Sequence, residues 1–392
     1  MKLHKIHILL SGLILLSAGS VEARKQSFTV FPFIAYSNET KLLGGGFVNY
    51  YNQTERDSLN NQLLVSTLAI YTANQQFQMI STPRYKIKDG KHILGLDIRG
   101  KNYPDKYYGI GNSSDEDVYE KFSQKKLKFG LSADTRIWKA FYAGVSSAVT
   151  QESVQKREAN LLPVTGGYHG MQGTDNYYNW GTQLSVRTTD DDFYPKKGLY
   201  YKADFKQYYQ LNKATPKHSF GGLDLEMKNY FTPSQGIVLA MQSTFKRIYP
   251  KSGIYSSSSG EPLEANSVPS DVPFTFYPEL GGELRVYDSK RFVDKVLIAE
   301  RAELRFTPAE LDFALKYGLW QTGFLQRVGF VVFSEVGQVA ADESELKFKR
   351  NHFSNGFGFR YGISRSPRLN IRMDIAFGGK TMNVIIQGSE AF

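Results

Sequence analysis

The sequence of 392 residues contains no cysteine. This absence excludes disulfide scaffolds, thiolate zinc sites, iron–sulfur clusters and cysteine nucleophiles. Tryptophan is scarce, with 3 residues against 25 Tyr and 27 Phe, and no apolar run of 18 residues follows the first two dozen positions. A protein built from membrane-spanning helices is therefore excluded. Hydrophobic residues make up 41% and charged residues 22%, which excludes general disorder.

Sequence motifs for catalysis or metal binding are also missing. The six histidines show neither an HExxH pattern nor any paired metal spacing, no GxSxG occurs, and no phosphate-binding loop follows Gly44-Gly45-Gly46. Asp190-Asp191-Asp192 offers carboxylates to a hard cation, but a solvated turn is the favoured interpretation. We therefore expect no enzyme, catalytic residue, metal or cofactor. A lipid-modifying enzyme remains a less favoured alternative, because Ser and His from different strands can meet in space.

The N-terminus is typical of a secretory signal peptide. Residues 1–7 carry Lys2 and Lys5, residues 8–18 form an apolar core, and Val21-Glu22-Ala23 supplies small residues at the positions that a signal peptidase reads. The segment is too short for a membrane span, and a buried helix is the alternative. We predict cleavage after Ala23, which leaves residues 24–392 as a single domain outside the cytoplasm.

The rest of the chain alternates strictly between apolar and polar residues, while helical periodicity is nearly absent. Residues 368–378 read RLNIRMDIAFG, so five apolar side chains share one face and four charged or polar ones share the other. Residues 126–137, 199–209 and 222–231 repeat this pattern. A soluble sandwich also alternates. Long segments with one apolar and one charged face, however, indicate a barrel with lipid outside and water inside.

Sixteen such segments can be counted, an even number as expected for a bacterial barrel. They are 27–37, 41–53, 59–72, 74–88, 91–103, 123–137, 140–150, 177–188, 197–211, 217–231, 235–250, 293–307, 323–340, 353–365, 368–379 and 383–392. Most connections after even-numbered segments are short, and several after odd-numbered ones are long. The pattern predicts an all-β fold: one antiparallel transmembrane β-barrel with short periplasmic turns, long outer loops and both termini periplasmic.

The C-terminal residue and the net charge suggest where the protein acts. Phe392 ends a predicted amphipathic strand, which is typical of the signal read by the outer-membrane assembly machinery, although Glu390 interrupts the apolar face. The net charge is +10. In an exported barrel this charge favours Lys and Arg side chains that line the lumen or contact anionic lipid head groups, rather than a nucleic-acid-binding surface. We expect the outer membrane of a Gram-negative-type bacterium, with membrane lipid and lipopolysaccharide as partners and the assembly machinery as a partner during biogenesis.

Four short patterns in the second half resemble the bacterial surface antigen family, the BamA/TamA-like assembly and translocation barrels. The patterns are Asp191-Asp192-Phe193-Tyr194-Pro195-Lys196-Lys197-Gly198, Gly281-Gly282-Glu283-Leu284-Arg285-Val286-Tyr287, Glu303-Leu304-Arg305-Phe306 and Glu335-Val336-Gly337. Residues 35–40 and 108–112 are similar to segments of stand-alone members. The resemblance covers essentially the whole mature chain. Two departures are Val286, where the family has a loop glycine, and the absence of the family's periplasmic polypeptide-transport-associated domains.

The resemblance implies a role for the motif at 281–287. In the family, the loop arginine folds into the lumen and pairs with strand carboxylates, and Arg285, Glu303 and Glu335 match those positions. We expect the tip of the 251–292 loop to enter the lumen, where Arg285 contacts Glu335, Glu303 or both, and Tyr287 of the same motif is a fourth candidate for this loop lock. The alternative is a purely structural brace.

Two functional hypotheses follow. The first is a factor for protein assembly or translocation that acts on an unfolded protein client or on lipid, with a separate periplasmic partner in place of the missing domains. The second is a passive surface antigen or channel. For the first, the resemblance together with Gly388 and Glu390 predicts that the first and last strands close the barrel through few hydrogen bonds.

Overall fold

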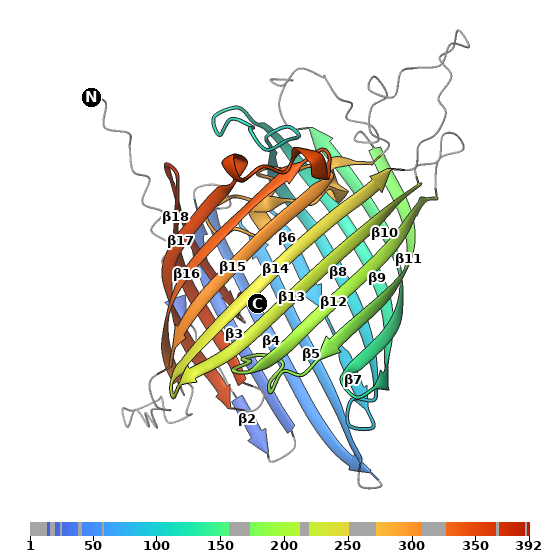
Figure 1. The fold of residues 1–392 in the computed structure, drawn as a ribbon, viewed down its shortest axis with the longest axis vertical. Helices are drawn as coiled ribbons and strands as arrows, with labels where there is room; N and C mark the ends of the chain where they lie inside the picture. The colour runs from blue at the N-terminus through green and yellow to red at the C-terminus, as the bar shows by residue number, and fades with distance from the viewer. Residues whose placement is uncertain are drawn as a thin grey trace.

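A computed structural model of the chain shows a barrel of long, tilted strands (Figure 1). The structure describes residues 14–15, 20–23, 26–37, 41–56, 59–156, 173–211, 219–250, 272–307, 327–365, 368–388 and 390–392. Most of the predicted signal peptide, residues 1–23, and the first half of the 251–292 loop lie outside these ranges. No helix in the described ranges is long and apolar enough to cross a membrane.

The barrel wall is a meander in which each strand pairs antiparallel with its sequence neighbours. Its strands are β3 (Gln26–Ser37), β4 (Lys41–Arg56), β5 (Leu59–Thr72), β6 (Phe77–Ser81), β7 (Arg84–Ile87), β8 (His92–Tyr107), β9 (Glu120–Trp138), β10 (Phe141–Lys156), β11 (Gly173–Arg187), β12 (Gly198–Gln210), β13 (Ser219–Ser234), β14 (Ile237–Pro250), β15 (Val296–Phe306), β16 (Arg327–Ala340), β17 (His352–Arg365), β18 (Arg368–Gly378) and β19 (Thr381–Gly388). The short 3-10 turns are η1 (Phe274–Phe276), η2 (Leu280–Gly282), η4 (Glu343–Glu345) and η5 (Phe348–Arg350).

The predicted antiparallel barrel is confirmed, and the seventeen strands from β3 to β19 are roughly consistent with the predicted number. β6 and β7 both pair with β5 on one side and β8 on the other, so they are two halves of one wall strand. Pro83 separates them, because proline cannot donate a ladder hydrogen bond. Counted this way, β3 to β19 form sixteen wall strands, which match the sixteen segments of the sequence prediction.

The alternation sorts side chains between the lumen and the outer surface. On β9, Leu127, Phe129 and Leu131 are exposed on the outer face. The Lys126 and Lys128 side chains lie on the opposite face, where Lys128 pairs with Asp97 at 2.7 Å. The same division recurs on β12, where Lys202 and Lys206 both pair with Asp204 on the inner face. An apolar exterior and a charged interior are the pattern of a barrel that spans a membrane.

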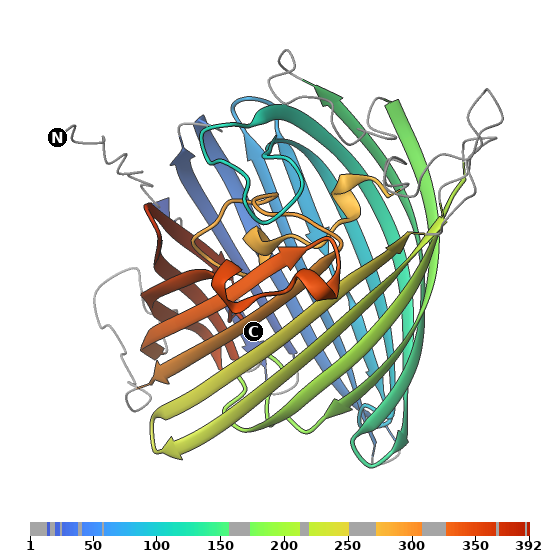
Figure 2. The same ribbon diagram turned by 45° about the horizontal axis from the view of Figure 1, so that its top comes forward.

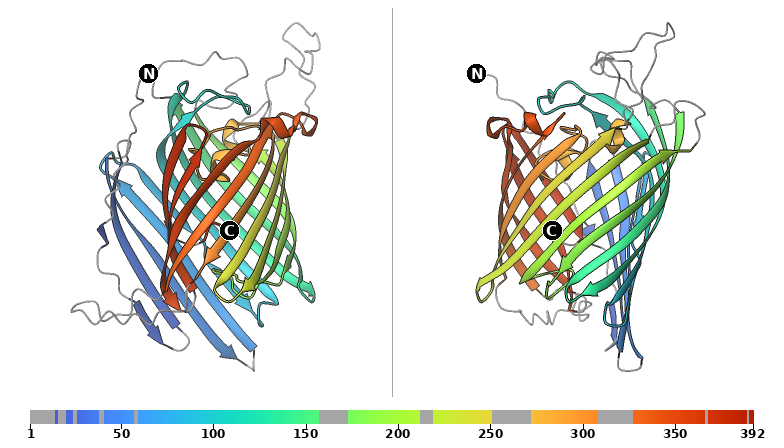
Figure 3. Two further views of the ribbon diagram at one scale, coloured as in Figure 1. Left: turned by 60° about the vertical axis from the view of Figure 1, so that its left-hand side comes forward. Right: turned by 45° about the vertical axis from the view of Figure 1, so that its right-hand side comes forward.

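The ends of the wall differ from the sequence prediction in one respect. The last strand was expected to run to Phe392, but β19 ends at Gly388. Glu390 was expected on the lipid-facing side, and instead it is buried in the interior with Arg360 and Asn370. Phe392 is also buried, and the C-terminus lies within the outline of the barrel in every view (Figures 1–3). The prediction failed because alternation was extended beyond the end of the strand.

The first and last strands border the one gap in the ladder of the described wall, which we call the seam. β19 pairs with β18 from Thr381 to Gly388, and β3 pairs with β4. The other edge of β3 carries two short strands, β1 (Ile14–Leu15) and β2 (Ser20–Ala23), which belong to the predicted signal peptide. The registers of the described residues contain no ladder between β3 and β19. Figure 3 (left) looks at the side where the first strands, in blue, and the last strands, in red, face each other.

Candidate functional site

The barrel interior is filled by the segment 272–295, which precedes β15 and appears in gold inside the ring of strands in Figure 2. Its aromatic residues pack against the inner wall. The ring of Phe274 lies 4.5 Å from that of Tyr107 on β8 and 5.3 Å from that of Phe122 on β9, measured between centroids. Leu280 and Leu284 are fully buried and pack against Leu297 and Val339. The segment therefore folds as an apolar plug with its own core.

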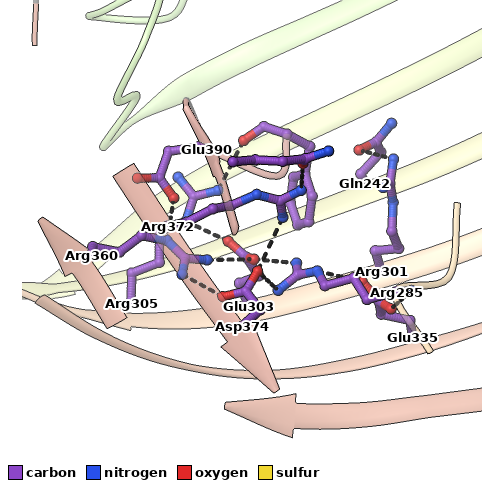
Figure 4. A network of polar contacts seen from close by, with 12 residues as sticks. Gln242, Arg285, Arg301, Glu303, Arg305, Glu335, Arg360, Arg372, Asp374 and Glu390 are labelled. Atoms are coloured by element: carbon purple, nitrogen blue, oxygen red, sulfur yellow. Dashed lines mark hydrogen bonds and ion pairs between the residues drawn. The ribbon is translucent and has the colours of Figure 1, made fainter. Parts of the chain in front are cut away.

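Arg285 fixes the tip of this plug to three strands (Figure 4). Its guanidinium contacts Glu303 of β15, Glu335 of β16 and Asp374 of β18; the Nε–Oε1 distance to Glu335 and the Nη1–Oδ2 distance to Asp374 are both 3.0 Å. Its main-chain N–H also donates to Glu335 Oε2 at 2.7 Å. The planar fork of arginine suits such multiple pairing, since five donors point outward in fixed directions. The guanidinium group also lies over the Phe333 ring, with 3.9 Å between its central carbon and the ring centroid.

Three further arginines extend the contact into a cluster. Arg305 donates to Glu303 Oε2 at 2.7 Å. Arg360 contacts Asp374 Oδ1 at 2.5 Å and Glu303 Oε1 at 3.3 Å. Arg372 reaches Asp374 Oδ2 at 3.1 Å. We call the eight residues of this network the lumenal charge cluster: Arg285, Glu303, Arg305, Glu335, Arg360, Arg372, Asp374 and Glu390.

The cluster is balanced in charge and buried. It combines four arginines with four carboxylates, and the side chains of Glu303, Glu335 and Asp374 have no exposed area. Burial works to lower the pKa of Arg285, but the surrounding carboxylates outweigh it and raise the pKa, so the guanidinium remains charged. Such a network strongly penalises the loss of one member, because its partner would remain buried without compensation.

The structure thus brings together Arg285, Glu303 and Glu335, the three residues selected from the sequence. Tyr287 lies outside the charge cluster. Its ring stacks edge-on against Phe292 and His352, with centroids 5.2 and 5.7 Å away. It therefore contributes to the packing of the plug rather than to the pairing of Arg285.

Val286, the departure from the family's glycine, is accommodated by an apolar pocket. It is buried with Val331, Phe333 and Ala376. A side chain at Gly378 would meet a Val286 methyl at 2.8 Å, so the absence of a side chain there makes room for the valine.

Sequence reasoning missed five members of the cluster: Arg305, Arg360, Arg372, Asp374 and Glu390. The first four lie on the polar phase of their strands, which marks them as interior. Alternation shows which face a residue occupies but not which residues from separate strands meet. That depends on strand register and on the path of the loop.

The C-terminal residues add a second contact to the cluster. Arg305 Nη2 donates to the main-chain oxygen of Phe392 at 2.8 Å, and the Phe392 ring packs with Tyr230 and Ala240. Glu390 accepts from Arg360 Nε at 2.7 Å. The predicted role of Phe392 as an assembly signal remains a prediction. In the folded barrel this residue is enclosed by the wall.

The extracellular mouth is covered by the connection 108–119, shown in teal (Figure 2). Asn112 is its main anchor. Its amide donates to Arg350 O at 2.7 Å and accepts from Val339 N–H at 2.9 Å, and its main-chain oxygen contacts His352 Nε2 at 2.9 Å. Gly111 N–H also donates to Val293 O of the plug at 2.8 Å. The connection therefore ties the plug to β16 and β17.

The periplasmic end is narrowed by the turn 188–197. Asp191 Oδ1 accepts from Phe193 and Tyr194 N–H at 2.7 and 2.9 Å, so its carboxylate stabilises the turn itself. Asp192 pairs with Lys86 of β7. Gly198 closes the turn at φ +105°, where a side chain would meet Thr188 O at 2.4 Å. A chamber of about 840 Å³ borders this turn and the C-terminal residues 390–392, and both acidic and basic side chains line it.

Comparisons with known proteins identify the fold. No protein-family model and no curated protein matches the sequence. The barrel of BamA from Haemophilus ducreyi, in a structure lacking POTRA domains 1–3, aligns with a TM-score of 0.51 and 12% identity over 96% of this chain and 75% of that chain. CdiB from Acinetobacter baumannii aligns with a TM-score of 0.50 and 10% identity over 97% of this chain and 65% of that one. At such low identity the likeness concerns the fold alone, which is that of an outer-membrane β-barrel.

Proposed function

We propose that this protein is an outer-membrane barrel that assists the assembly or translocation of a client at its seam. The observation that carries the proposal is the plug at 272–295, pinned by Arg285 to β15, β16 and β18. One of the pinned strands, β18, pairs with β19, the last strand of the wall. Asn383 of β19 itself donates to Arg285 O at 3.0 Å. The plug thus supports the edge of the wall that borders the seam.

The seam is suited to this role, since it is the one junction where the described registers contain no ladder. The edge of β3 away from β4 pairs with the short strands β1 and β2, so it can accept an extended segment. An unpaired strand edge is a template for pairing with another extended chain. The likeness to the BamA and CdiB folds is compatible with the proposal, without specifying a client.

A passive channel is the second candidate, and the filled lumen argues against it. The plug occupies the interior, and the connection 108–119 covers its extracellular side. Sixteen-stranded porins conduct because their lumen is open. The charged chamber at the periplasmic end is the observation that favours this alternative. Such a channel would open only if the plug moved.

The decisive experiment combines depletion with a seam that can be locked. Because the chain lacks cysteine, one Cys in β3 and one in β19 form the only possible disulfide. Cells depleted of the protein should lose a subset of outer-membrane proteins or show altered outer-membrane lipid. Wild type should restore the profile, the oxidised double-Cys variant should fail to do so, and reductant should recover its activity.

The controls separate locking from damage. Each single-Cys variant should behave as wild type under both redox conditions. A double-Cys variant between β9 and β10, whose register is continuous, should restore the profile even when oxidised. An unchanged envelope after depletion, or full activity of the locked seam, would contradict the proposal. Efficient crosslinking in one register along the whole of β3 and β19 would remove its structural premise.

A further inference from the structure

The loop that joins β16 to β17 packs on the outer rim of the barrel rather than over the lumen. Its turns η4 and η5 are the red turns at the near rim in Figure 2. Arg247, which faces outward from β14, pairs with Asp342 at 3.5 Å and with Glu343. Gln338, which faces outward from β16, accepts from Lys347 N–H at 3.1 Å and donates to Asn351 at 2.6 Å. We call residues 341–351 the rim flap.

The rim flap carries an apolar tip between cations. Phe348 is 82% exposed, more than any other large apolar side chain in the described residues. Lys347 and Lys349 flank it and form no ion pair within the described residues, whereas Arg350 pairs with Glu345 at 3.4 Å. An exposed aromatic between lysines suits the boundary between acyl chains and phosphate groups, where the ring enters the apolar layer and the ammonium groups reach phosphate.

Beneath the flap lies a groove of about 220 Å³ on the lipid-facing wall. Its lining includes Ile298 and Val336 from the wall, Leu346 and Phe348 from the flap, and the charged residues Lys347 and Glu300. An apolar furrow of about 400 Å³ continues from it across β10 to β15, since both share Ile298 and Glu300 as lining residues. The continuous surface offers space for an acyl chain below a polar head group.

Glu300 is the unusual member of this groove. Among the strand side chains described, it is the one carboxylate on the outer face, because every other strand Asp or Glu lies on the inward phase. It accepts a hydrogen bond from Ser243 at 2.6 Å, and no described cation pairs with it. It lies four residues from the extracellular end of β15. An ionisable side chain on a membrane-facing surface calls for a specific partner.

We propose that the rim-flap groove binds a zwitterionic aminophospholipid, of the phosphatidylethanolamine class, in the outer leaflet. Its phosphate would pair with Lys347, its ammonium with Glu300, and one acyl chain would follow the furrow beside Ile298. The opposite charges of Lys347 and Glu300 within one small groove decide this assignment. A purely anionic head group would satisfy the lysine and leave the carboxylate facing negative charge. The inference is independent of the proposed function.

Native mass spectrometry of the full chain, folded in nonionic detergent micelles, tests the site. Phosphatidylethanolamine and phosphatidylglycerol with identical acyl chains are titrated in parallel. Wild type should bind the first at about tenfold lower concentration than the second. Glu300→Gln should abolish this preference, because it removes the charge that recognises ammonium and keeps the shape of the side chain. Lys347→Gln should weaken binding of both lipids.

The matched control is Lys125→Gln, which removes an outward-facing lysine from β9, away from the groove, and should change neither affinity. Retention of the heat-dependent gel shift by each variant shows that the barrel is folded. Equal binding of the two lipids by wild type would overturn the proposal, as would a preference that survives in Glu300→Gln. A third titration with diphosphorylated lipid A covers the other outer-leaflet lipid. Tighter binding of lipid A, lost in Lys347→Gln, would also overturn it and assign the groove to a glycolipid.

Discussion

At the scale of single residues, Glu335 depends on Arg285 more than the other carboxylates do. Glu303 retains Arg305 and Arg360 if Arg285 is removed. Within the described residues, Glu335 forms its one ion pair with Arg285. Arg285→Ala therefore leaves a buried carboxylate without an ion-pair partner, at a cost of about 3–5 kcal/mol. We expect a lower melting temperature on semi-native gels and greater protease access to residues 272–295.

The control for this first prediction is a double-mutant cycle. Glu335→Gln together with Arg285→Ala should be less destabilised than the sum of the two single changes, because the double variant no longer buries an unpaired charge. Arg285→Lys should recover only part of the stability, since a point charge cannot reproduce the planar fork. If Arg285→Ala melts like wild type and its plug remains equally protected, the pairing contributes nothing to stability.

The residues of the cluster show what the sequence could reveal. Arg285, Glu303 and Glu335 were predicted because they occur in short motifs with a known resemblance. Asp374 was identified only as an interior residue of the RLNIRMDIAFG segment. Its pairing with Arg285 joins residues 89 positions apart, and no local pattern encodes that contact. Short motifs thus predicted Arg285, Glu303 and Glu335. The contact with Asp374 depends on strand register and on the path of the loop.

At the scale of elements, the connection 108–119 should behave as a separable lid. Asn112→Ala removes the amide contacts to Arg350 O and Val339 N–H and leaves the wall ladders intact. The second prediction is faster proteolysis within 108–119 with a barrel melting temperature close to that of wild type. Limited proteolysis followed by mass spectrometry locates the cut. The neighbouring Ser113→Ala is the control, and equal protection of both variants would show that Asn112 does not hold the lid.

Strand positions were predicted well where alternation and turns agree. The segment 59–72 coincides with β5, because polar turns limit it on both sides. The segment 74–88 was treated as one strand, and Pro83 divides it into β6 and β7. The failure at residues 390–392 has a different origin. Interior arginines bind Glu390 and Phe392 and draw them off the strand, and alternation contains no information about such contacts.

The contact of Arg305 with the C-terminal residues gives a third prediction at this scale. Arg305→Met keeps an apolar stem but removes the donor to Phe392 O and one of the partners of Glu303. The segment 390–392 should then detach from Tyr230, which a single Cys at position 391 would report through faster labelling by a water-soluble maleimide. The comparison is with the same Cys in the wild-type background. Unchanged labelling would mean that packing of the Phe392 ring alone holds the segment.

At the scale of the whole molecule, the plug and the lid block the lumen one after the other along the barrel axis. The plug fills the lumen at the level of the charge cluster, and the lid lies between it and the extracellular side. A chamber of about 840 Å³ lies at the periplasmic end, and a smaller cavity of about 240 Å³ lies between the plug and the inner faces of β12 to β14. Ions that enter this chamber meet the plug before they can cross. A barrel of sixteen strands can therefore be wide and still closed.

The fourth prediction follows for planar lipid bilayers. Wild type should conduct at a level about tenfold or more below that of an open porin of equal strand number, since its plug blocks the path. Asn112→Ala alone should leave this low level unchanged, because the plug remains pinned. Arg285→Ala should add larger, fluctuating openings, and combining it with Asn112→Ala should lengthen them. A large, steady conductance in wild type would show that the lumen is open, and the passive channel would then become the better account of this barrel.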